Sequence, residues 1–449
     1  MKKWQHDLVL RIVKLLNIML ITGMFALCWY QYYSQQMQSP FYRNGHYLVL
    51  ALYFILYCTF GNVYEGFAIS MKQISEIGYS QSLAALVSDG IMFIIIWLLT
   101  KEFPRMMPMF LVFGLQIVIS VLWAKMAHDW YYRTFPPRAT TVVYDVRHGM
   151  QKLVEEYGLA KKYDVQRTLS VSECLEDLSQ LENMETVFIS GVHSHDRNII
   201  LKYCVANNIE VLVIPRVGDV IMSGARSIHM FHLPMLQVRR YDATPEYLFT
   251  KRLMDIVISL AALILCSPVM LIVSLLIKAY DGGPILYSQV RLTKDNKLFR
   301  IHKFRSMRTD AEEDGVARLS TGVGDERVTP IGQVLRRMRL DELPQLWDIL
   351  RGDLSVVGPR PERPEIAEQY MEEMPEFQLR LQAKAGLTGY AQVYGKYNTT
   401  PYDKLQMDLM YIAHPSIVQD LKIMLATVKI LFMADSTEGV EDGHTTAVK

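Results

Sequence analysis

Long apolar runs with few charged residues are the feature that most constrains this chain. A helix needs roughly 20 apolar residues to cross the hydrocarbon core of a bilayer. Runs of that length recur through residues 1–135, and they predict a four-helix transmembrane domain there. A cleavable signal peptide is not expected, because no small-residue cleavage site follows the first run. The predicted spans are 12–32, 44–64, 83–100 and 106–124.

The basic residues around these spans favour a cytoplasmic N-terminus. By the positive-inside rule, cytoplasmic loops carry the excess of Lys and Arg. Four spans would then return the chain to the cytoplasm at Pro136-Pro137, a predicted linker. Asp89 lies near one end of the third predicted span, so an interfacial position is favoured over a functional intramembrane carboxylate. The residues that support this orientation are Lys2, Lys3, Arg11, Lys14, Lys72, Lys125, Arg133 and Arg138, and those that oppose it are Arg43, Lys101 and Arg105.

Residues 138–243 alternate between β-branched runs and helix-like stretches. This alternation predicts a Rossmann-like α/β domain with a parallel sheet. A dinucleotide site would need a G-x-G-x-x-G loop after the first strand, but Asp145 to Gly149 offers a single glycine. The loop is therefore degenerate, and the domain is interpreted as a scaffold or regulatory module. The predicted strands are 140–146, 185–191 and 210–216, and the predicted helices are 149–157, 172–182 and 194–206.

A further apolar run extends from Ile256 to Ile277 and carries no charge. It is long enough to span a membrane. Ser267-Pro268 falls in its middle, where proline removes a backbone hydrogen bond and clashes with the preceding turn. The residues alone leave two interpretations: a kinked fifth span, or a segment that breaks and leaves by the face it entered.

Composition excludes several classes of protein. The formal net charge is +1 and 21% of residues are charged, which disfavours a strongly basic nucleic-acid binder. The five cysteines are scattered without C-x-x-C or Cys/His spacing, so buried reduced thiols are expected rather than disulfides or zinc sites.

The stretch from Leu335 to Leu346 places the adjacent carboxylates Asp341 and Glu342 beside three arginines. Neighbouring side chains on a helix diverge by about 100°, so the two carboxylates suit two roles rather than one shared proton. An Asp can act as a nucleophile that forms an acyl phosphate, and a Glu oxygen can bind Mg²⁺ when phosphates complete the coordination. The alternative is a solvated, charged helix face.

Two more basic segments strengthen the functional interpretation. Arg300 to Met307 alternates polar and apolar residues, as in a half-buried strand that presents Lys303 and Arg305 on one face. Further along, Arg360 stands between two prolines, which reduce the freedom lost when that arginine binds an anion. Together with Asp341 and Glu342, these segments indicate a cationic pocket suited to phosphoryl chemistry. Apolar positions over 335–350 and 404–434 recur near helical spacing, and 436–449 is expected to be a flexible tail.

At this point the sequence resembles the bacterial sugar transferases, or monotopic phosphoglycosyl transferases, over about residues 250–435. The four spans and the Rossmann-like domain are similar to the large subgroup, the polyprenyl glycosylphosphotransferases of exopolysaccharide and capsule synthesis. Two departures, Ala385 and Tyr394, stand where many relatives have proline and asparagine. Both lie outside the Asp341-Glu342 pair, so they do not bear on the expected activity, but they weaken any inference about sugar recognition at these positions. The motifs that carry the resemblance are Lys251-Arg252 with Asp255, Ser267-Pro268, Lys303-Phe304-Arg305-Ser306-Met307, Leu340-Asp341-Glu342-Leu343-Pro344-Gln345, Gly358-Pro359-Arg360-Pro361-Glu362 and Gly386-Leu387-Thr388-Gly389-Tyr390-Ala391-Gln392-Val393.

The resemblance implies a membrane enzyme with a monotopic catalytic domain over 251–435. Such an enzyme transfers a sugar-1-phosphate from a UDP-sugar to undecaprenyl phosphate and releases UMP. Asp341 would be the nucleophile and Glu342 the Mg²⁺ ligand. The residues implied around the substrate are Lys303, Arg305, Arg336, Arg360 and Glu362.

The resemblance also favours a re-entrant helix over 253–278, broken at Ser267 and Pro268, because a fifth full span would carry Asp341 away from cytoplasmic UDP-sugars. The Ser267 hydroxyl is a candidate partner for a backbone group freed at the break. The expected location is the cytoplasmic face of the bacterial inner membrane, in contact with membrane lipid. Nucleic acid is not expected as a partner, whereas a second copy of the chain and downstream glycosyltransferases are compatible with the resemblance.

Two other functions remain open from the residues. One is a non-enzymatic, membrane-anchored regulator whose α/β domain senses a nucleotide. The other is a polytopic glycosyl transferase that uses direct attack, without an enzyme-bound intermediate.

Overall fold

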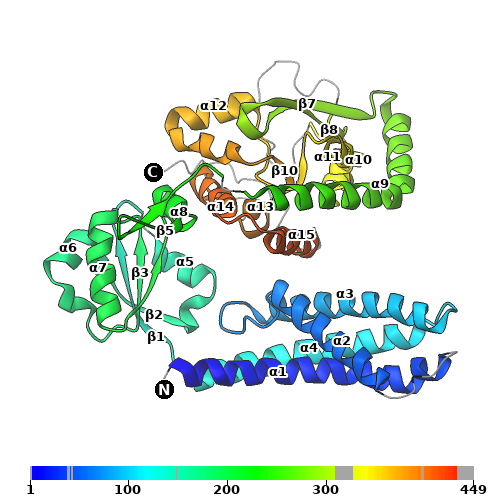
Figure 1. The fold of residues 1–449 in the computed structure, drawn as a ribbon, viewed down its shortest axis with the longest axis horizontal. Coiled ribbons are helices and arrows are strands. Elements are labelled where there is room, and N and C mark those ends of the chain that lie inside the picture. The colour runs from blue at the N-terminus through cyan, green and yellow to red at the C-terminus, as the bar shows by residue number, and fades with distance from the viewer. Residues whose placement is uncertain are drawn as a thin grey trace. The chain divides into compact units, whose positions relative to one another are not determined.

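The structure is a computed structural model, and it describes residues 3–37, 41, 44–147, 149–241, 243–308, 327–395 and 399–431. The chain divides into two compact units, Met1–Ile214 and Pro215–Lys449 (Figure 1). Each unit is described by itself. The predicted tail 436–449 lies outside the described residues.

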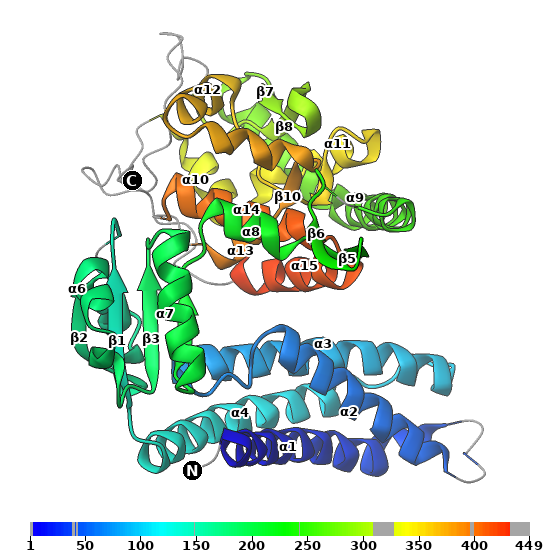
Figure 2. The same ribbon diagram turned by 60° about the vertical axis from the view of Figure 1, so that its left-hand side comes forward.

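The first unit begins with long apolar helices that lie alongside one another (Figure 2). Large aromatic side chains fill the space between them, and Phe25 stacks on Tyr53 with ring centroids 4.1 Å apart. The described residues contain five helices long and apolar enough to cross a membrane, and four of them lie over the predicted N-terminal spans. These elements are α1 (Lys3–Cys28), η1 (Trp29–Tyr33), η2 (Ser34–Gln36), α2 (Gly45–Val63), α3 (Ile74–Thr100) and α4 (Met107–Thr134).

The sequence interpretation favoured an interfacial position for Asp89, near one end of its span. In the structure, Asp89 does not lie at the end of its helix. Helix α3 begins nine residues before the predicted span, so Asp89 falls in its interior. The side chain is buried in the bundle (3% exposed), near Tyr53 and Gln116. The apolar run marked the hydrophobic centre of α3, whereas the polar start of the helix at 74–82 carried no hydropathy signal.

The α/β region of this unit holds a parallel sheet, as predicted. In the described part of the chain, the sheet has the strand order β2-β1-β3-β4. The register of β1 on β2 shifts between Thr140 and Thr141. Figure 1 shows α6 and α7 on one face of the sheet and α5 on the other. The elements are β1 (Arg138–Tyr144), α5 (Met150–Glu156), η3 (Leu159–Lys161), β2 (Tyr163–Ser170), α6 (Val171–Glu176), η4 (Leu178–Leu181), β3 (Thr186–Ser190), α7 (Ser194–Ala206) and β4 (Glu210–Val213).

Two details of this region differ from the sequence prediction. Strand β2 was missed, because its exposed alternate positions are polar and its apolar residues do not form a run. The region also ends earlier than residue 243, since residues from Pro215 onward belong to the second unit. There α8 (Val217–Ser223) packs on α14 (Pro401–Ala413), followed by the hairpin β5 (Arg226–Met230) and β6 (Leu233–Gln237).

The second unit combines short strand pairs with many helices around one apolar core. Strands β7 and β8 form an antiparallel hairpin, and β9 and β10 pair in parallel. The elements are α9 (Pro245–Asp281), β7 (Leu286–Leu292), η5 (Lys294–Asn296), β8 (Leu298–Phe304), α10 (Pro330–Arg337), η6 (Leu340–Glu342), α11 (Gln345–Arg351), β9 (Ser355–Val357), α12 (Pro364–Glu373), η7 (Pro375–Gln382), β10 (Gly386–Thr388), α13 (Tyr390–Tyr394), α14 and α15 (Ile417–Leu431).

Thr-Pro pairs start several helices of this unit. In α9, α10 and α14 the threonine hydroxyl caps the helix by accepting a hydrogen bond from a backbone N–H of the first turn. Proline then occupies the first helical position, where its missing N–H costs no hydrogen bond. The caps therefore fix where these helices begin: at residues 245, 330 and 401.

Helix α9 contains the predicted re-entrant segment and bends within it. Near its start, Arg252 donates to the carbonyl oxygen of Ile349 in α11. At its end, Asp281 pairs with Arg305 just after β8, and β8 packs against α11. A straight helix would separate residues 252 and 281 by about 43 Å, too far for both contacts. Figure 1 shows the bend, which follows from Pro268 inside the helix.

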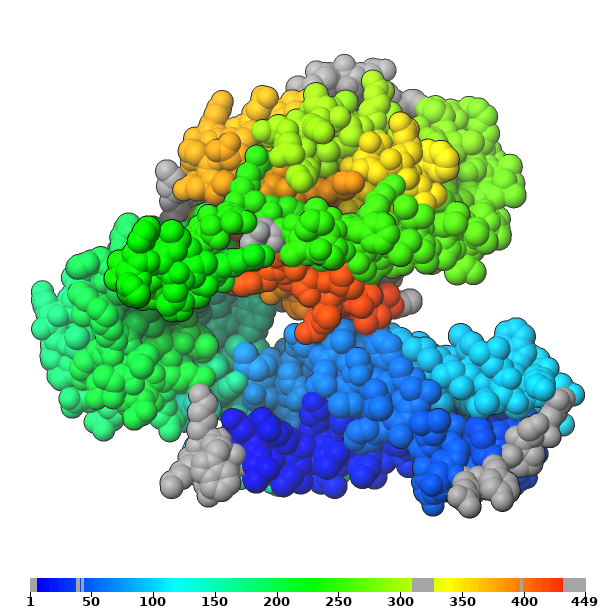
Figure 3. Space-filling view, in the orientation of Figure 1, coloured from blue at the N-terminus to red at the C-terminus, as the bar shows by residue number. Residues whose placement is uncertain are grey.

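The bend keeps its backbone hydrogen bonding through a neighbouring side chain. Pro268 has no N–H to donate to the carbonyl of Ile264, four residues earlier. The Ser267 hydroxyl donates to that carbonyl instead, at 2.8 Å. The predicted break is thus a bend in one continuous helix, with Ser267 as the partner that the sequence suggested. Figure 3 shows α9 at the surface of this unit with α15 beside it, and Leu265 of α9 is 77% exposed.

Candidate active site

The adjacent carboxylates Asp341 and Glu342 lie in a tight turn between α10 and α11, not on a continuous helix. Arg339 adopts a left-handed conformation (φ 53°) that ends α10, and Leu340–Glu342 form a single 3₁₀ turn. Pro344 then precedes α11. The leucine spacing predicted a helix through this point, because helices flank the turn on both sides and each buries leucines, Leu335 in α10 and Leu346 in α11. The turn projects the two carboxylates into a buried setting, with Asp341 8% exposed.

Glu342 is held between two cations from distant parts of the chain. Lys303 Nζ donates to Glu342 Oε1 at 2.9 Å, and Arg360 Nη2 lies 3.5 Å from the same oxygen. Burial alone would raise the pKa of Glu342, but Lys303 and Arg360 outweigh it and lower that pKa to about 2. Glu342 is therefore an anion at any physiological pH.

Asp341 has the opposite electrostatic behaviour. Burial raises the pKa of the Asp341 carboxyl, and the neighbouring Glu342 charge adds to that rise. Lys303, Arg336 and Arg360 each oppose the rise without cancelling it. Asp341 is thus more basic than an ordinary aspartate, while the cations around it still favour its ionised form. A basic carboxylate beside cations fits a nucleophile that attacks phosphorus.

Three separate elements bring the cations to this turn. Lys303 comes from β8, and Arg336 comes from the last turn of α10, where its Nε donates to Ser306 Oγ at 2.9 Å. Arg360 follows β9, and its side chain is about half exposed (46%). Gly358 allows the chain to approach here, because a Cβ at this position would lie 2.2 Å from the carbonyl oxygen of Lys384.

Arg305 and Glu362, two other residues expected at the substrate, make different contacts. Arg305 pairs with Asp281 at the end of α9, so it fastens that helix to the unit. Its side chain is only 7% exposed. The prediction placed Lys303 and Arg305 at the same site, but Lys303 pairs with Glu342 whereas Arg305, just after β8, pairs with Asp281.

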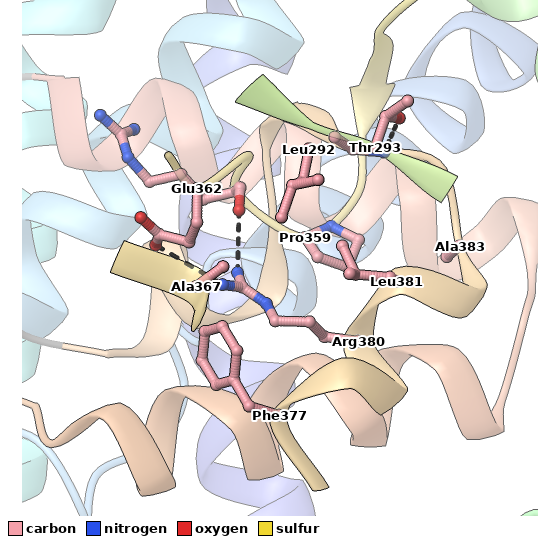
Figure 4. Close-up of a pocket in the computed structure, with 11 residues that line it drawn as sticks. Leu292, Thr293, Pro359, Glu362, Ala367, Phe377, Arg380, Leu381 and Ala383 are labelled. Carbon is pink, nitrogen blue, oxygen red and sulfur yellow. Dashed lines mark hydrogen bonds and ion pairs between the residues drawn. The ribbon is translucent and has the colours of Figure 1, made fainter. Parts of the chain in front are cut away.

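Glu362 lines a small pocket, where its carboxylate faces Arg380 (Figure 4). Its carboxylate lies 3.5 Å from Arg380 Nη1 and 4.0 Å from Arg291 Nη1. Arg360 also lines this pocket. Glu362 is therefore joined to the site through the chain segment it shares with Arg360.

Sequence reasoning assigned no role to two buried carboxylates that support the site, Asp348 and Asp255, although Asp255 stands in one of the recognised motifs. Asp348 in α11 is fully buried; its Oδ2 accepts from the backbone N–H of His302 at 2.9 Å, and its Oδ1 lies 2.6 Å from Nδ1 of that histidine. Burial raises the pKa of Asp348, and His302 opposes the rise. Asp255 in α9 accepts hydrogen bonds from Ser355 Oγ and Val356 N in β9. The available signal was a lone carboxylate inside an apolar stripe, as in Leu346-Trp347-Asp348-Ile349.

The turn is also where a divalent metal ion would fit. The described residues contain no group of three or more His, Cys, Asp or Glu side chains that could hold a metal ion. Mg²⁺ commonly takes one or two carboxylates and completes its octahedron with water and substrate phosphates. The ionised Glu342, next to Asp341, supplies hard oxygen donors of that kind. The donor set therefore fits an ion that binds together with a diphosphate.

Comparisons with known proteins point to one family. Residues 246–434 match the model of the bacterial sugar transferase family. Over 190 residues the chain is 42% identical to an exopolysaccharide production protein of Rhizobium leguminosarum bv. phaseoli, a match that covers 40% of this chain and 94% of the relative.

Two longer relatives match over about half of their length. One is a UDP-N-acetylgalactosamine-undecaprenyl-phosphate N-acetylgalactosaminephosphotransferase of Aeromonas hydrophila, 36% identical over 51% of this chain and 54% of the relative. The other is a UDP-glucose:undecaprenyl-phosphate glucose-1-phosphate transferase of Klebsiella pneumoniae, 37% identical over 49% of this chain and 48% of the relative. The motifs, the site and the near-complete coverage of the Rhizobium relative together show that this chain belongs to the bacterial sugar transferase family.

Proposed function

We propose that this protein transfers a sugar-1-phosphate from a UDP-sugar to undecaprenyl phosphate, the step that begins a surface polysaccharide. The observation that carries the proposal is the pair of buried Asp341 and half-buried Glu342, with Glu342 set between Lys303 and Arg360. The names of the Aeromonas and Klebsiella relatives support the two substrates.

The reaction would proceed in two displacements at one phosphorus atom. An Asp341 carboxylate oxygen attacks the β-phosphorus of the UDP-sugar, the bond from that phosphorus to the bridging oxygen breaks, and UMP leaves. A phosphate oxygen of undecaprenyl phosphate then attacks the same phosphorus and displaces Asp341. The product is undecaprenyl-diphosphate-sugar, and the carboxylate is regenerated.

The surrounding charges suit this chemistry. Lys303, Arg336 and Arg360 would stabilise the negative charge that builds on the phosphates as UMP departs. Glu342, with its depressed pKa, would hold Mg²⁺, which supplies further neutralisation of the diphosphate when bound. The raised pKa of Asp341 makes its carboxylate a better nucleophile than an ordinary aspartate.

The bent helix α9 supports a catalytic domain that rests on one face of the membrane. Both ends of α9 contact the same compact unit, as a helix that enters and leaves by one face requires. Apolar side chains such as Ile264 and Leu265 are exposed near the bend and would face lipid. The site could then reach a soluble UDP-sugar and a lipid phosphate at the interface. We infer that this face is the cytoplasmic face of the bacterial inner membrane, where UDP-sugars are made.

The experiment uses the full chain in vesicles with undecaprenyl phosphate, Mg²⁺ and a panel of UDP-sugars, with UMP release as the readout. Asp341→Asn is expected to lower UMP release by at least about a thousand-fold while the protein still folds. Asp353→Asn, an exposed carboxylate in the same unit, is the matched control and should keep activity.

Mass spectrometry without acceptor lipid tests the intermediate. Wild type should carry a sugar-phosphate on the peptide that contains residue 341. UMP release that needs the acceptor and leaves no adduct would replace this mechanism with direct attack. Wild-type turnover by Asp341→Asn would remove the nucleophile assignment, and no UMP from any UDP-sugar would favour the non-enzymatic regulator.

A further inference from the structure

The segment that carries Arg360 cannot hold itself in place by ordinary main-chain pairing. Two of its four residues, Pro359 and Pro361, have no N–H to donate. Its carbonyl groups are nevertheless all bonded, two by backbone N–H groups and two by arginine side chains. The donors are Gly386 N to Pro359 O (2.9 Å), Arg380 Nη2 to Arg360 O (2.9 Å), Arg291 Nη1 to Pro361 O (3.2 Å) and Leu292 N to Glu362 O (3.0 Å).

Arg380 makes the most connections in this arrangement. It lies in η7, and only 5% of the residue is exposed. Besides the carbonyl of Arg360, it reaches Glu362, with Nη1 3.5 Å from Oε1. Its guanidinium carbon also lies 4.9 Å from the centre of the Phe377 ring. Figure 4 shows this guanidinium beside Phe377, with dashed lines to its partners in the pocket.

Asp408 in α14 supplies the charge that keeps Arg380 in the interior. Asp408 Oδ2 lies 2.8 Å from Arg380 Nη2, and the residue is 1% exposed. A planar guanidinium can serve a carboxylate and a carbonyl in fixed directions at the same time, whereas the single ammonium of lysine cannot. The buried Arg380–Asp408 pair is therefore fixed in place, and Arg380 in turn holds the segment 359–362.

We propose that Arg380 is a positioning residue that acts through Arg360: it fixes the backbone at residue 360 so that the Arg360 side chain reaches Glu342 and the substrate diphosphate. This inference rests on the proposed function. Arg380 touches neither Asp341 nor Glu342 in any described contact, so its effect on the reaction passes through the segment it binds. The Arg360 side chain is half exposed and long, and a fixed backbone removes one source of its freedom.

The test is a double-mutant cycle between Arg380→Lys and Arg360→Ala, measured as kcat and KM for UMP release from the UDP-sugar that wild type uses. Arg380→Lys alone should lower kcat/KM by about ten- to a hundred-fold, as expected for misplacement of a substrate-binding group. In the Arg360→Ala background, the same change should have an effect within about twofold, because the group it positions is gone. Equal losses in the two backgrounds would overturn the proposal.

A second variant covers the case in which Arg380→Lys does not fold. Arg380→Met with Asp408→Asn removes both buried charges, which avoids an unpaired carboxylate in the interior. It should give the same loss of kcat/KM and the same lack of additivity with Arg360→Ala. Arg351→Lys, an exposed arginine of α11, is the matched control and should leave kcat and KM unchanged.

The outcomes separate this inference from the proposed function. If wild type releases UMP and a folded Arg380 variant retains wild-type kcat/KM, the positioning role is wrong and the proposed function stands. If wild type releases no UMP from any UDP-sugar, the proposed function itself fails.

Discussion

The two α/β regions of this protein are stabilised in different ways. In residues 138–213, parallel strands of four to eight residues pair through the main chain over an apolar core that includes Val143, Ile189 and Ile200. In the second unit (Pro215–Lys449), called the catalytic unit below, β9 and β10 have three residues each. Buried charged side chains bind to these short strands, and also to the seven-residue strand β8.

The position of these charges explains the difference. Asp255 binds β9 just before the Arg360 segment, and Asp348 binds β8 next to Lys303. Arg380 binds the Arg360 segment itself. The chain after β9 and the end of the seven-residue strand β8 present cations to Asp341 and Glu342, and buried hydrogen bonds fix both positions. Loss of a charge should therefore have a large effect in the catalytic unit and a small one in the sheet.

The largest expected effect is at Lys251, which anchors the start of α9. Lys251 Nζ lies 3.0 Å from Asp420 Oδ2, and Asp420 is fully buried, with Tyr247 and Tyr411 also bonded to it. Lys251→Met leaves a buried carboxylate unpaired, so we expect a loss of about 3–5 kcal/mol in the stability of this unit. The measurement is the thermal unfolding midpoint of the full chain in nanodiscs, together with UMP release.

The control for this variant removes both charges. Lys251→Met with Asp420→Asn should recover most of the lost stability, because the uncompensated charge is gone. If Lys251→Met alone unfolds at the wild-type temperature, the charge is not needed to hold α9, and the contrast between the two regions fails at this point.

The second prediction concerns Lys303 and the pH dependence of transfer. Lys303 lowers the pKa of Asp341, which burial raises. Lys303→Met removes that cation, so Asp341 should bind its proton more tightly and the acid limb of the kcat–pH profile should move to higher pH. The rate at neutral pH should also fall about a hundred-fold, because a charge that stabilises the departing phosphate is lost.

Glu342→Gln should shift the acid limb of the kcat–pH profile in the opposite direction, and this variant serves as the comparison. The Glu342 charge raises the pKa of Asp341, so its removal should move the acid limb to lower pH. Glu342 itself, with a pKa of about 2, should add no limb of its own above that pH. If the acid limb shifted in the same direction in both variants, the electrostatic account of Asp341 would be contradicted.

Much of this architecture could be predicted from sequence, because apolar runs and β-branched alternation depend on local burial. The four spans and the strands at 140–146 and 185–191 follow from such patterns. The charged residues near the turn were also recognised, because cations beside paired carboxylates suit phosphoryl chemistry, and Lys303 and Arg360 do meet at Glu342.

The remaining features depend on contacts between distant residues. In the sequence, Arg305 resembles a second site cation beside Lys303. In the structure, Asp281, which lies 24 residues earlier in the chain, binds the Arg305 guanidinium. Arg380 and Asp408 look like ordinary surface charges until folding brings them together in the interior. A local pattern cannot show which of several arginines will be buried, because burial there depends on a partner elsewhere in the chain.

The smallest expected effect is at the Arg138–Glu210 pair, which joins β1 and β4 at the rim of the sheet. Its side chains are 30% and 41% exposed, so water screens their attraction. Lys162 lies close by, where it repels Arg138 and attracts Glu210, so the pair belongs to a small surface cluster of charges. Arg138→Ala should therefore cost less than about 1 kcal/mol in stability and leave UMP release unchanged. The thermal midpoint in nanodiscs checks this, and a drop as large as that of Lys251→Met would show that the sheet also depends on its charges.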